Sequence, residues 1–164
     1  MKKIVSAILK TQEALGTFLL AVFFVAIVLQ IVARYTARYT GIVLIWTEEV
    51  ANYSFIWAVF MGASAMVYHR AHFSFSFFQE RFKGKAGALY SAGISLILLG
   101  FTLAMTYYGI QIVEEFWYYN WITIPEIPMG YTWLCLPIMG VTMSLYSIMN
   151  IYDDLMRAKR EGAQ

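Results

Sequence analysis

Charged residues are scarce in this sequence, and the places that lack them define its class. Asp, Glu, Lys and Arg make up 13% of the 164 residues, against about 25% in a soluble domain. The net charge of +2 is too small to indicate nucleic-acid binding. Cys135 is the only cysteine, which excludes an internal disulfide and a cysteine-based metal site. What is abundant is hydrophobic residues, at 60%.

Four long stretches contain no charged residue at all. Each can cross a bilayer as a helix, because about 20 residues at 1.5 Å rise cover a ~30 Å hydrocarbon core. The connections between them are too short to fold into a soluble domain. The sequence therefore predicts an all-α membrane protein in which residues 1–164 form a single domain. Its four transmembrane helices are expected at 14–33, 50–68, 86–113 and 127–152.

The first stretch is interpreted as a retained anchor rather than a cleaved signal peptide. Lys2 and Lys3 give a positive start, but the apolar run exceeds the usual ~7–15 residues. It ends at Arg34 and Tyr35 without a small-x-small cleavage site.

Basic residues are distributed unevenly around the four stretches. Ten of the twelve lie near the N-terminus, in the 69–85 connection or in the C-terminal tail, and only Arg34 and Arg38 lie elsewhere. Because basic residues are retained on the cytoplasmic side, this pattern predicts a cytoplasmic N-terminus and C-terminus. Aromatic residues in both outer connections are typical of a membrane boundary. They are Tyr35, Tyr39, Trp46, Trp117, Tyr118, Tyr119 and Trp121.

Two shorter segments have amphipathic patterns. In residues 1–13 the apolar side chains Ile4, Val5, Ile8 and Leu9 share one helical face, which predicts an amphipathic helix lying in the inner interface. In the 69–85 connection, Phe75, Phe78 and Phe82 also share a helical face. The alternation from Phe73 to Phe77 fits a strand equally well, so both interpretations stay open.

Small residues and one proline predict how the helices pack. Gly62-Ala63-Ser64-Ala65 and the pair Gly93 and Gly100 allow close approach of helices. We expect them to pack within the four helices, with docking to another subunit as the alternative. Pro137 is expected to kink the fourth helix, because proline removes a backbone hydrogen bond.

Side chains for chemistry are missing from the apolar stretches. None of the four contains an ionisable residue, the usual sign of an ion or proton pathway. The only histidines, His69 and His72, lie together at one helix end, whereas a haem needs ligands on facing helices. We expect these histidines to make interfacial hydrogen bonds. No catalytic residue, metal site or cofactor is predicted, and the protein is not expected to be an enzyme.

A first motif combines Arg34 and Tyr35 with Trp46-Thr47-Glu48-Glu49. Thr47 is expected to cap the second helix, with both glutamates at the positive end of its dipole. A hairpin would also bring Arg34 near one of the glutamates. Whether the acids act only at the helix start or also pair with Arg34 stays open.

Two further patterns follow along the chain. Gly62-Ala63-Ser64-Ala65 precedes Arg70-Ala71-His72, and Ile127-Pro128-Met129-Gly130 leads into Leu136-Pro137. Alone, the first pattern indicates close packing before a basic anchor. The second indicates a loop that enters a kinked helix. In this order and at these depths, the three motifs resemble the small membrane subunit of tripartite ATP-independent periplasmic (TRAP) transporters. The phenylalanines after His72 depart from the aliphatic residues more usual there.

The resemblance implies an accessory role in transport. Such a subunit joins a much larger multispanning subunit in the bacterial inner membrane. A periplasmic substrate-binding protein delivers an organic acid, such as a dicarboxylate or sialic acid, and a sodium gradient drives its uptake. The large subunit holds the substrate and sodium sites, while the small subunit braces the scaffold and helps to dock the binding protein.

The candidate contact residues follow from the motifs. They are Arg34, Trp46, Glu48, Glu49, Arg70 and His72, for structural or intersubunit contacts. Membrane lipids are expected as further partners. Replacing Glu48 or Glu49 is expected to weaken uptake. Three alternatives remain: a homo-oligomeric small exporter or channel, an anchor of a redox complex, and a purely structural membrane protein.

Overall fold

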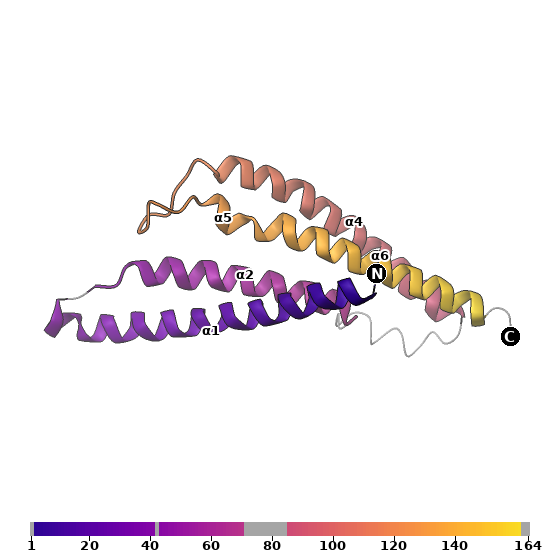
Figure 1. Cartoon of the computed structure of the whole chain (residues 1–164), viewed down its shortest axis with the longest axis horizontal. Helices are drawn as coiled ribbons and strands as arrows, with labels where there is room; N and C mark the ends of the chain where they lie inside the picture. The colour runs from indigo at the N-terminus through magenta and orange to yellow at the C-terminus, as the bar shows by residue number, and fades with distance from the viewer. Residues whose placement is uncertain (1, 42, 71–84, 162–164) are drawn as a thin grey trace.

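The computed structural model describes residues 2–41, 43–70 and 85–161. Within these ranges the regular structure is helical, apart from one isolated β-bridge between Asn120 and Pro128. The helices are α1 (Lys2–Thr40), α2 (Trp46–Tyr68), α4 (Lys85–Phe116), α5 (Gly130–Trp133) and α6 (Cys135–Glu161) (Figure 1). The predicted Phe75, Phe78 and Phe82 segment lies outside the described residues.

The four predicted spans are confirmed as helices. Four helical segments are long and apolar enough to cross a membrane, and the fourth combines α5 with α6. They are Lys3–Thr40, Trp46–Tyr68, Ala86–Phe116 and Gly130–Arg160. At 1.5 Å per residue, α1 is about 58 Å long, nearly twice the thickness of a hydrocarbon core. It must therefore tilt or extend beyond the core.

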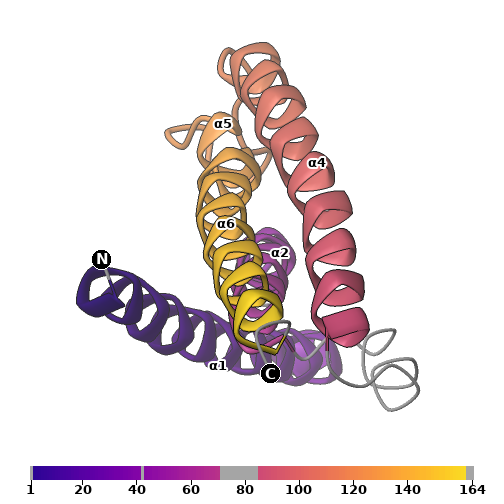
Figure 2. The same ribbon diagram turned by 90° about the vertical axis from the view of Figure 1, so that its right-hand side faces the viewer.

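The helices form two antiparallel pairs. The α1–α2 hairpin packs against the α4–α6 hairpin mainly through α2 and α6. Figure 1 shows the two hairpins offset along the long axis, and Figure 2 shows α1 crossing α6 at an angle. We call the end with the α1–α2 and α4–α5 connections the connection end. The end with residues 2–13, 69–70 and 153–161 is the terminal end.

The N-terminal segment is not a separate element. Residues 2–13 are helical, as predicted, but they continue into the first span without a break. Val5 and Leu9 are buried, and Val5 belongs to a core cluster with Met143 and Tyr146 of α6. Much of the predicted apolar face therefore packs on protein, because α1 crosses the other hairpin here. A position of this segment in the membrane interface stays a prediction.

The seam between α4 and α6 is made of small and hydroxyl side chains. The hydroxyls of Thr102 and Ser144 are 2.9 Å apart, and both residues are buried. A Cβ atom added at Gly140 would lie 3.0 Å from the Thr106 backbone nitrogen and 3.1 Å from the Thr102 carbonyl oxygen. One added at Gly109 would lie 2.9 Å from Leu136 Cβ. These glycines let the two helices approach closely.

The glycines singled out in the sequence have a different role. At Gly62, Gly93 and Gly100 an added Cβ would meet no described atom within 4 Å, so these three do not pack within the bundle. The expectation that they do was wrong, because these glycines lie on exposed faces of α2 and α4. Ser64, in contrast, is fully buried. The internal close contacts fall instead at Gly109 and Gly140.

Near Pro137 the helix is interrupted only at Leu134, whose backbone stays helical (φ −56°, ψ −22°), and the kink expected at Pro137 stays a prediction. The break separates the one-turn helix α5 from α6. Pro137 lies in the first turn of α6, where it cannot donate a hydrogen bond to the carbonyl of Trp133. Trp133 is the last residue of α5.

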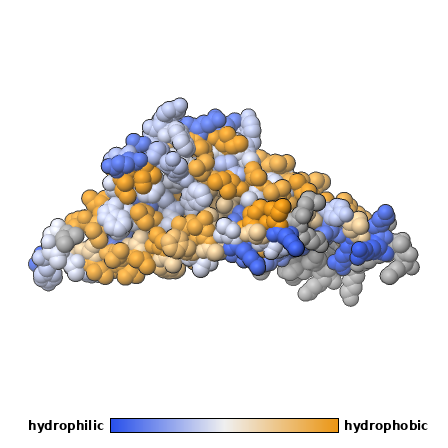
Figure 3. Space-filling view, viewed as in Figure 1, coloured by the Kyte–Doolittle hydropathy of each residue, from blue (hydrophilic) through white to orange (hydrophobic). Residues whose placement is uncertain are grey.

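The surface suits a bilayer. Large hydrophobic side chains such as Phe24, Ile97 and Phe101 are exposed on the long helices. Figure 3 shows apolar side chains over the middle of the visible face, with hydrophilic ones at the terminal end and along the upper edge of the view. The predicted boundary aromatics lie at the connection end, and Tyr35, Tyr39 and Tyr118 are among the most exposed. The orientation of the termini across the membrane stays a prediction.

Candidate functional site

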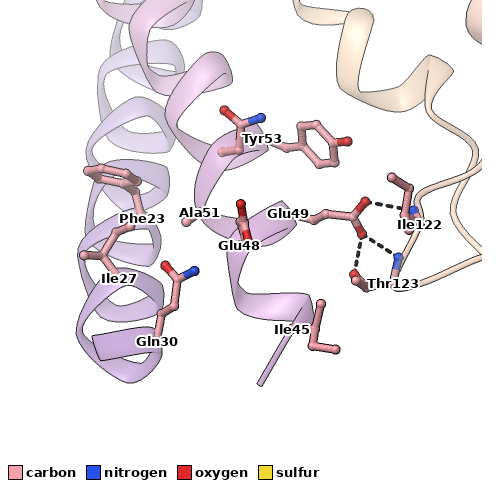
Figure 4. Close-up of a pocket in the computed structure, with 11 residues that line it drawn as sticks. Phe23, Ile27, Gln30, Ile45, Glu48, Glu49, Ala51, Tyr53, Ile122 and Thr123 are labelled. Carbon is pink, nitrogen blue, oxygen red and sulfur yellow. Dashed lines mark hydrogen bonds between the residues drawn. The ribbon is translucent and has the colours of Figure 1, made fainter. Parts of the chain in front are cut away.

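At the connection end, hydrogen bonds of Glu49 join the two hairpins. We call a polar contact of this kind between the hairpins a tie. Glu49 lies in the first turn of α2, and its carboxylate reaches across to the α4–α5 connection (Figure 4). The backbone N–H groups of Ile122 and Thr123 donate to it at 2.8 and 2.9 Å, and the Thr123 hydroxyl donates as well. Hydrogen bonds to a charged acceptor contribute about 1.5–3 kcal/mol each when shielded from water. One side chain therefore fixes the position of this loop.

The α4–α5 connection, which Glu49 holds, also contains hydrogen bonds within itself. Backbone hydrogen bonds join Trp121 N–H to Ile127 at 3.0 Å and Met129 N–H to Tyr119 at 2.7 Å. The Trp121 indole donates to the hydroxyl of Thr132 in α5 at 3.1 Å, and its ring lies 4.5 Å from that of Tyr53 in α2. Trp121 thus bridges both hairpins beside Glu49.

The expected cap of α2 was wrong. The N-cap position is Ile45, and no side chain caps it. Thr47 is helical and fully buried, and its hydroxyl donates to the Leu44 carbonyl oxygen at 2.6 Å. A buried hydroxyl bonds whatever acceptor is near, and here that acceptor precedes the helix. The placement of Glu48 and Glu49 in the first turn is confirmed.

The suggested pairing of Arg34 with a glutamate is not present. Glu49 turns toward the loop, away from α1 (Figure 4). Arg34 and Glu48 line one hollow of about 230 Å³, but the described part of the chain contains no ion pair between them. A larger hollow of about 750 Å³ lies between α1, α2 and the loop, with both glutamates at its wall. Trp46, at the start of α2, is 42% exposed.

Arg70 ties the hairpins at the terminal end. Its guanidinium pairs with Asp154 of α6 and donates to the Asn150 carbonyl oxygen at 2.9 Å and to the Asn150 side chain at 3.2 Å. Asn150 in turn donates to the carbonyl of Val67 at 3.0 Å. Asp154 is only 3% exposed. His72 lies outside the described residues.

The backbone of Arg70 adapts to this role. Its φ of 54° lies in the left-handed region, which costs a non-glycine residue about 1–2 kcal/mol. The residue follows the C-cap His69, where such a conformation commonly ends a helix. The bonds to α6 stabilise the strained position. His69 itself makes a half-exposed pair with Glu13 of α1 at 2.9 Å.

A third tie, centred on Gln12, was not predicted from the sequence. Gln12 is 6% exposed and donates to the Thr142 hydroxyl at 2.9 Å. Its carbonyl oxygen accepts from the hydroxyls of Tyr146 at 2.8 Å and Ser64 at 3.2 Å. The cluster joins α1, α2 and α6. Polar residues inside apolar spans tend to bond one another, so Ser64, Thr142 and Tyr146 were the available signal.

The described polar side chains of the site join the two hairpins. Across the described ranges, no three His, Cys, Asp or Glu side chains lie close enough to hold a metal ion. Cys135 is fully buried. The helices of the two hairpins make one main contact. The polar residues connect the hairpins at both ends and between these ends.

Comparison with known families agrees with this architecture. A family model described as "Tripartite ATP-independent periplasmic transporters, DctQ component" matches residues 7–157. A search of curated proteins found no significant match. The matched range includes all three ties, at Gln12, Glu49 and Arg70. Because the model covers nearly the whole chain, this protein belongs to the DctQ family, the small membrane component of TRAP transporters.

Proposed function

We propose that the chain is the scaffold subunit of a sodium-driven TRAP transporter that takes up an organic acid. The observation that carries the proposal is the set of polar ties between two hairpins whose apolar spans lack ionisable residues. A moving carrier needs ion and substrate ligands within the membrane. A subunit without them, but with its helices locked together, suits a static brace for a larger transport subunit.

The proposed orientation places the connection end in the periplasm and both termini in the cytoplasm of a bacterial inner-membrane protein. The basic residues support this orientation, since ten of twelve lie in the N-terminal segment, the 69–85 connection or the C-terminal tail of the sequence. Glu48, Trp46 and Arg34 then face the periplasmic side with exposed side chains. They are available to the substrate-binding protein or to the large subunit.

Four of the six candidate residues divide into two groups under this proposal. Glu49 and Arg70 act inside the subunit, because their polar atoms are engaged with the other hairpin. Glu48 and Trp46 act between subunits. Replacing Glu49 should therefore weaken uptake through the loop, whereas replacing Glu48 should affect docking or assembly only.

Co-purification tests the proposed function most directly. The tagged chain, extracted from native membranes in mild detergent, is expected to bring one larger multispanning protein at equal stoichiometry, identified by mass spectrometry. A lone homo-oligomer would overturn the proposal and favour the small exporter or channel. The substrate can then be sought by measuring sodium-dependent uptake with the matching periplasmic protein.

Replacing Glu49 with alanine is expected to loosen the α4–α5 connection. Its three hydrogen bonds are partly exposed to water, so their loss together removes only on the order of 1.5 kcal/mol of local stability, which corresponds to about tenfold faster amide exchange. Hydrogen-exchange mass spectrometry of the peptide containing Ile122 and Thr123 measures this. Glu48→Ala is the matched control, because Glu48 precedes Glu49 and makes no bond to the loop in the described structure. Equal exchange in both variants would contradict the tie.

A further inference from the structure

We propose that the outer face of α4 binds a transmembrane helix of the larger subunit, and that Glu114 selects that helix over a second copy of this chain. The proposal rests on the proposed function, because the larger subunit is the partner named there. α4 lies at the edge of the molecule, with α5 and α6 along one side and no other described helix on the opposite side (Figure 1, Figure 2). The opposite side is the outer face.

A row of exposed residues on this face has the spacing by which helices pack together. Its positions are alternately three and four residues apart, which is the repeat of a helix that packs along another helix. They are Gly93, Leu96, Gly100, Leu103, Tyr107 and Ile110, and all six are exposed. We call this row the outer seam. At 1.5 Å per residue it is about 26 Å long, most of a ~30 Å hydrocarbon core.

The two glycines of the outer seam indicate a helix rather than lipid as the occupant. At Gly93 and at Gly100 an added Cβ atom would meet no described atom within 4 Å. Glycine is among the least favourable residues in a helix, and a flexible lipid chain gains nothing from it. A neighbouring helix gains, because glycine lets its backbone approach closely. The length agrees, since one lipid chain reaches through only about half of the core.

The inner side of α4 shows that small residues at seven-residue spacing mark a helix contact in this chain. Four such residues are buried there: Ala88, Ser95, Thr102 and Gly109. Thr102 shares a hydrogen bond of 2.9 Å with Ser144 of α6. A Cβ atom added at Gly109 would lie 2.9 Å from Leu136 Cβ, also in α6. The glycines of the outer seam repeat the same interval on the other side of the helix, where a second helix can pack in the same way.

Glu114 decides between two helical occupants. It is exposed, occupies the next position of the repeat after Ile110, and forms no ion pair with the residues that the structure describes. Two copies of one membrane protein share the same orientation, so a symmetric pair through α4 would place each residue beside its own counterpart. Glu114 would then face Glu114, and such like charges oppose association. A different helix can present a basic side chain at this level instead.

Site-specific photocrosslinking in native membranes tests the surface. Benzoylphenylalanine replaces Leu96 or Leu103 in the outer seam. The matched control is Phe101, which is 64% exposed on the same helix but points about 160° away from Leu103, at 100° per residue. Crosslinks from both seam positions to one larger multispanning protein are expected, with loss of that product at Phe101. A product of twice the mass of the chain would indicate a second copy and overturn the proposal, as would equal yields from all three positions.

Charge reversal tests the role of Glu114. Glu114→Lys is expected to lower the recovery of the larger protein about threefold, because the basic side chain on the partner then meets a like charge. Glu115→Lys is the matched control, since Glu115 is also exposed but lies outside the outer seam. Circular dichroism checks that both variants are folded. Equal recovery with the two variants would contradict the selection by Glu114.

The outcomes separate this inference from the proposed function. If the larger protein co-purifies with the parent chain but crosslinks to Phe101 and not to the outer seam, the surface is wrong and the proposed function stands. If the parent chain brings no larger protein, the proposed function fails, and this inference fails with it.

Discussion

Replacing Arg70 with methionine is expected to lower the free energy of unfolding by about 2–3 kcal/mol. The change leaves the carboxylate of Asp154 buried without its cation, and its second oxygen has no partner among the residues that the structure describes. Breaking a fully buried pair costs about 3–5 kcal/mol. The smaller value applies here because the Arg70 side chain is 37% exposed and partly screened. Thermal unfolding in detergent, followed by tryptophan fluorescence, measures the loss.

A double variant separates the unpaired charge from the lost contact. Arg70→Met with Asp154→Leu removes both charges and should recover much of the stability, since no charge is then left buried. His69→Ala serves as the matched control for the neighbouring pair with Glu13. Its side chains are about half exposed, so the loss there should stay within ~1 kcal/mol. Equal losses for Arg70→Met and His69→Ala would mean that Arg70 does not hold the terminal end together.

The fold could be predicted in outline because a bilayer restricts the possibilities. Runs without charge, ended by residues such as Arg34 and Glu114, give the spans and their order. Composition does not determine the angle at which the helices cross. The burial of Gln12 illustrates this: it lies between Lys10 and Glu13, on what looks like the polar face of a surface helix. Only the crossing of α1 with α6 brings it inside.

The candidate site was predicted in part for a similar reason. Glu49 and Arg70 stood out from their place at helix ends, and both prove to be tied to the other hairpin. Their partners, Thr123 and Asp154, are more than 70 residues away in the chain. No local pattern gives such a pairing. For Arg34, proximity across a short connection suggested a partner that the geometry does not provide.

The positions of the three ties restrict how the two hairpins can move relative to each other. The two hairpins diverge toward the connection end, so helix packing alone would allow them to swing about the α2–α6 contact. Glu49 prevents this swing at one end and Arg70 at the other, while Gln12 holds the crossing point. A brace that supports a moving partner needs this stiffness. If the chain braces a sodium-driven transporter as proposed, loss of any one tie should reduce transport without changing the number of coupled sodium ions.

Alanine at Gly140 is expected to destabilise the protein by about 1–3 kcal/mol relative to alanine at Gly100. Both changes add the same methyl group to a helical glycine, so the gain in helix propensity cancels in the comparison. At Gly140 the new Cβ meets backbone atoms of Thr106 and Thr102 at 3.0 and 3.1 Å, as well as the Thr106 hydroxyl. At Gly100 it meets nothing within 4 Å. Backbone atoms cannot rotate away, so α4 and α6 must separate.

The separation should also break a specific bond. Thr102 and Ser144 share a buried hydrogen bond one turn from Gly140, and polar contacts of this kind contribute about 0.6 kcal/mol between membrane helices. Unfolding temperatures of the two variants, measured side by side in the same detergent, test the expectation. If Gly100→Ala loses as much stability as Gly140→Ala, the exposed face of α4 is covered in the purified protein. If neither loses stability, the close seam between α4 and α6 does not hold the second hairpin together.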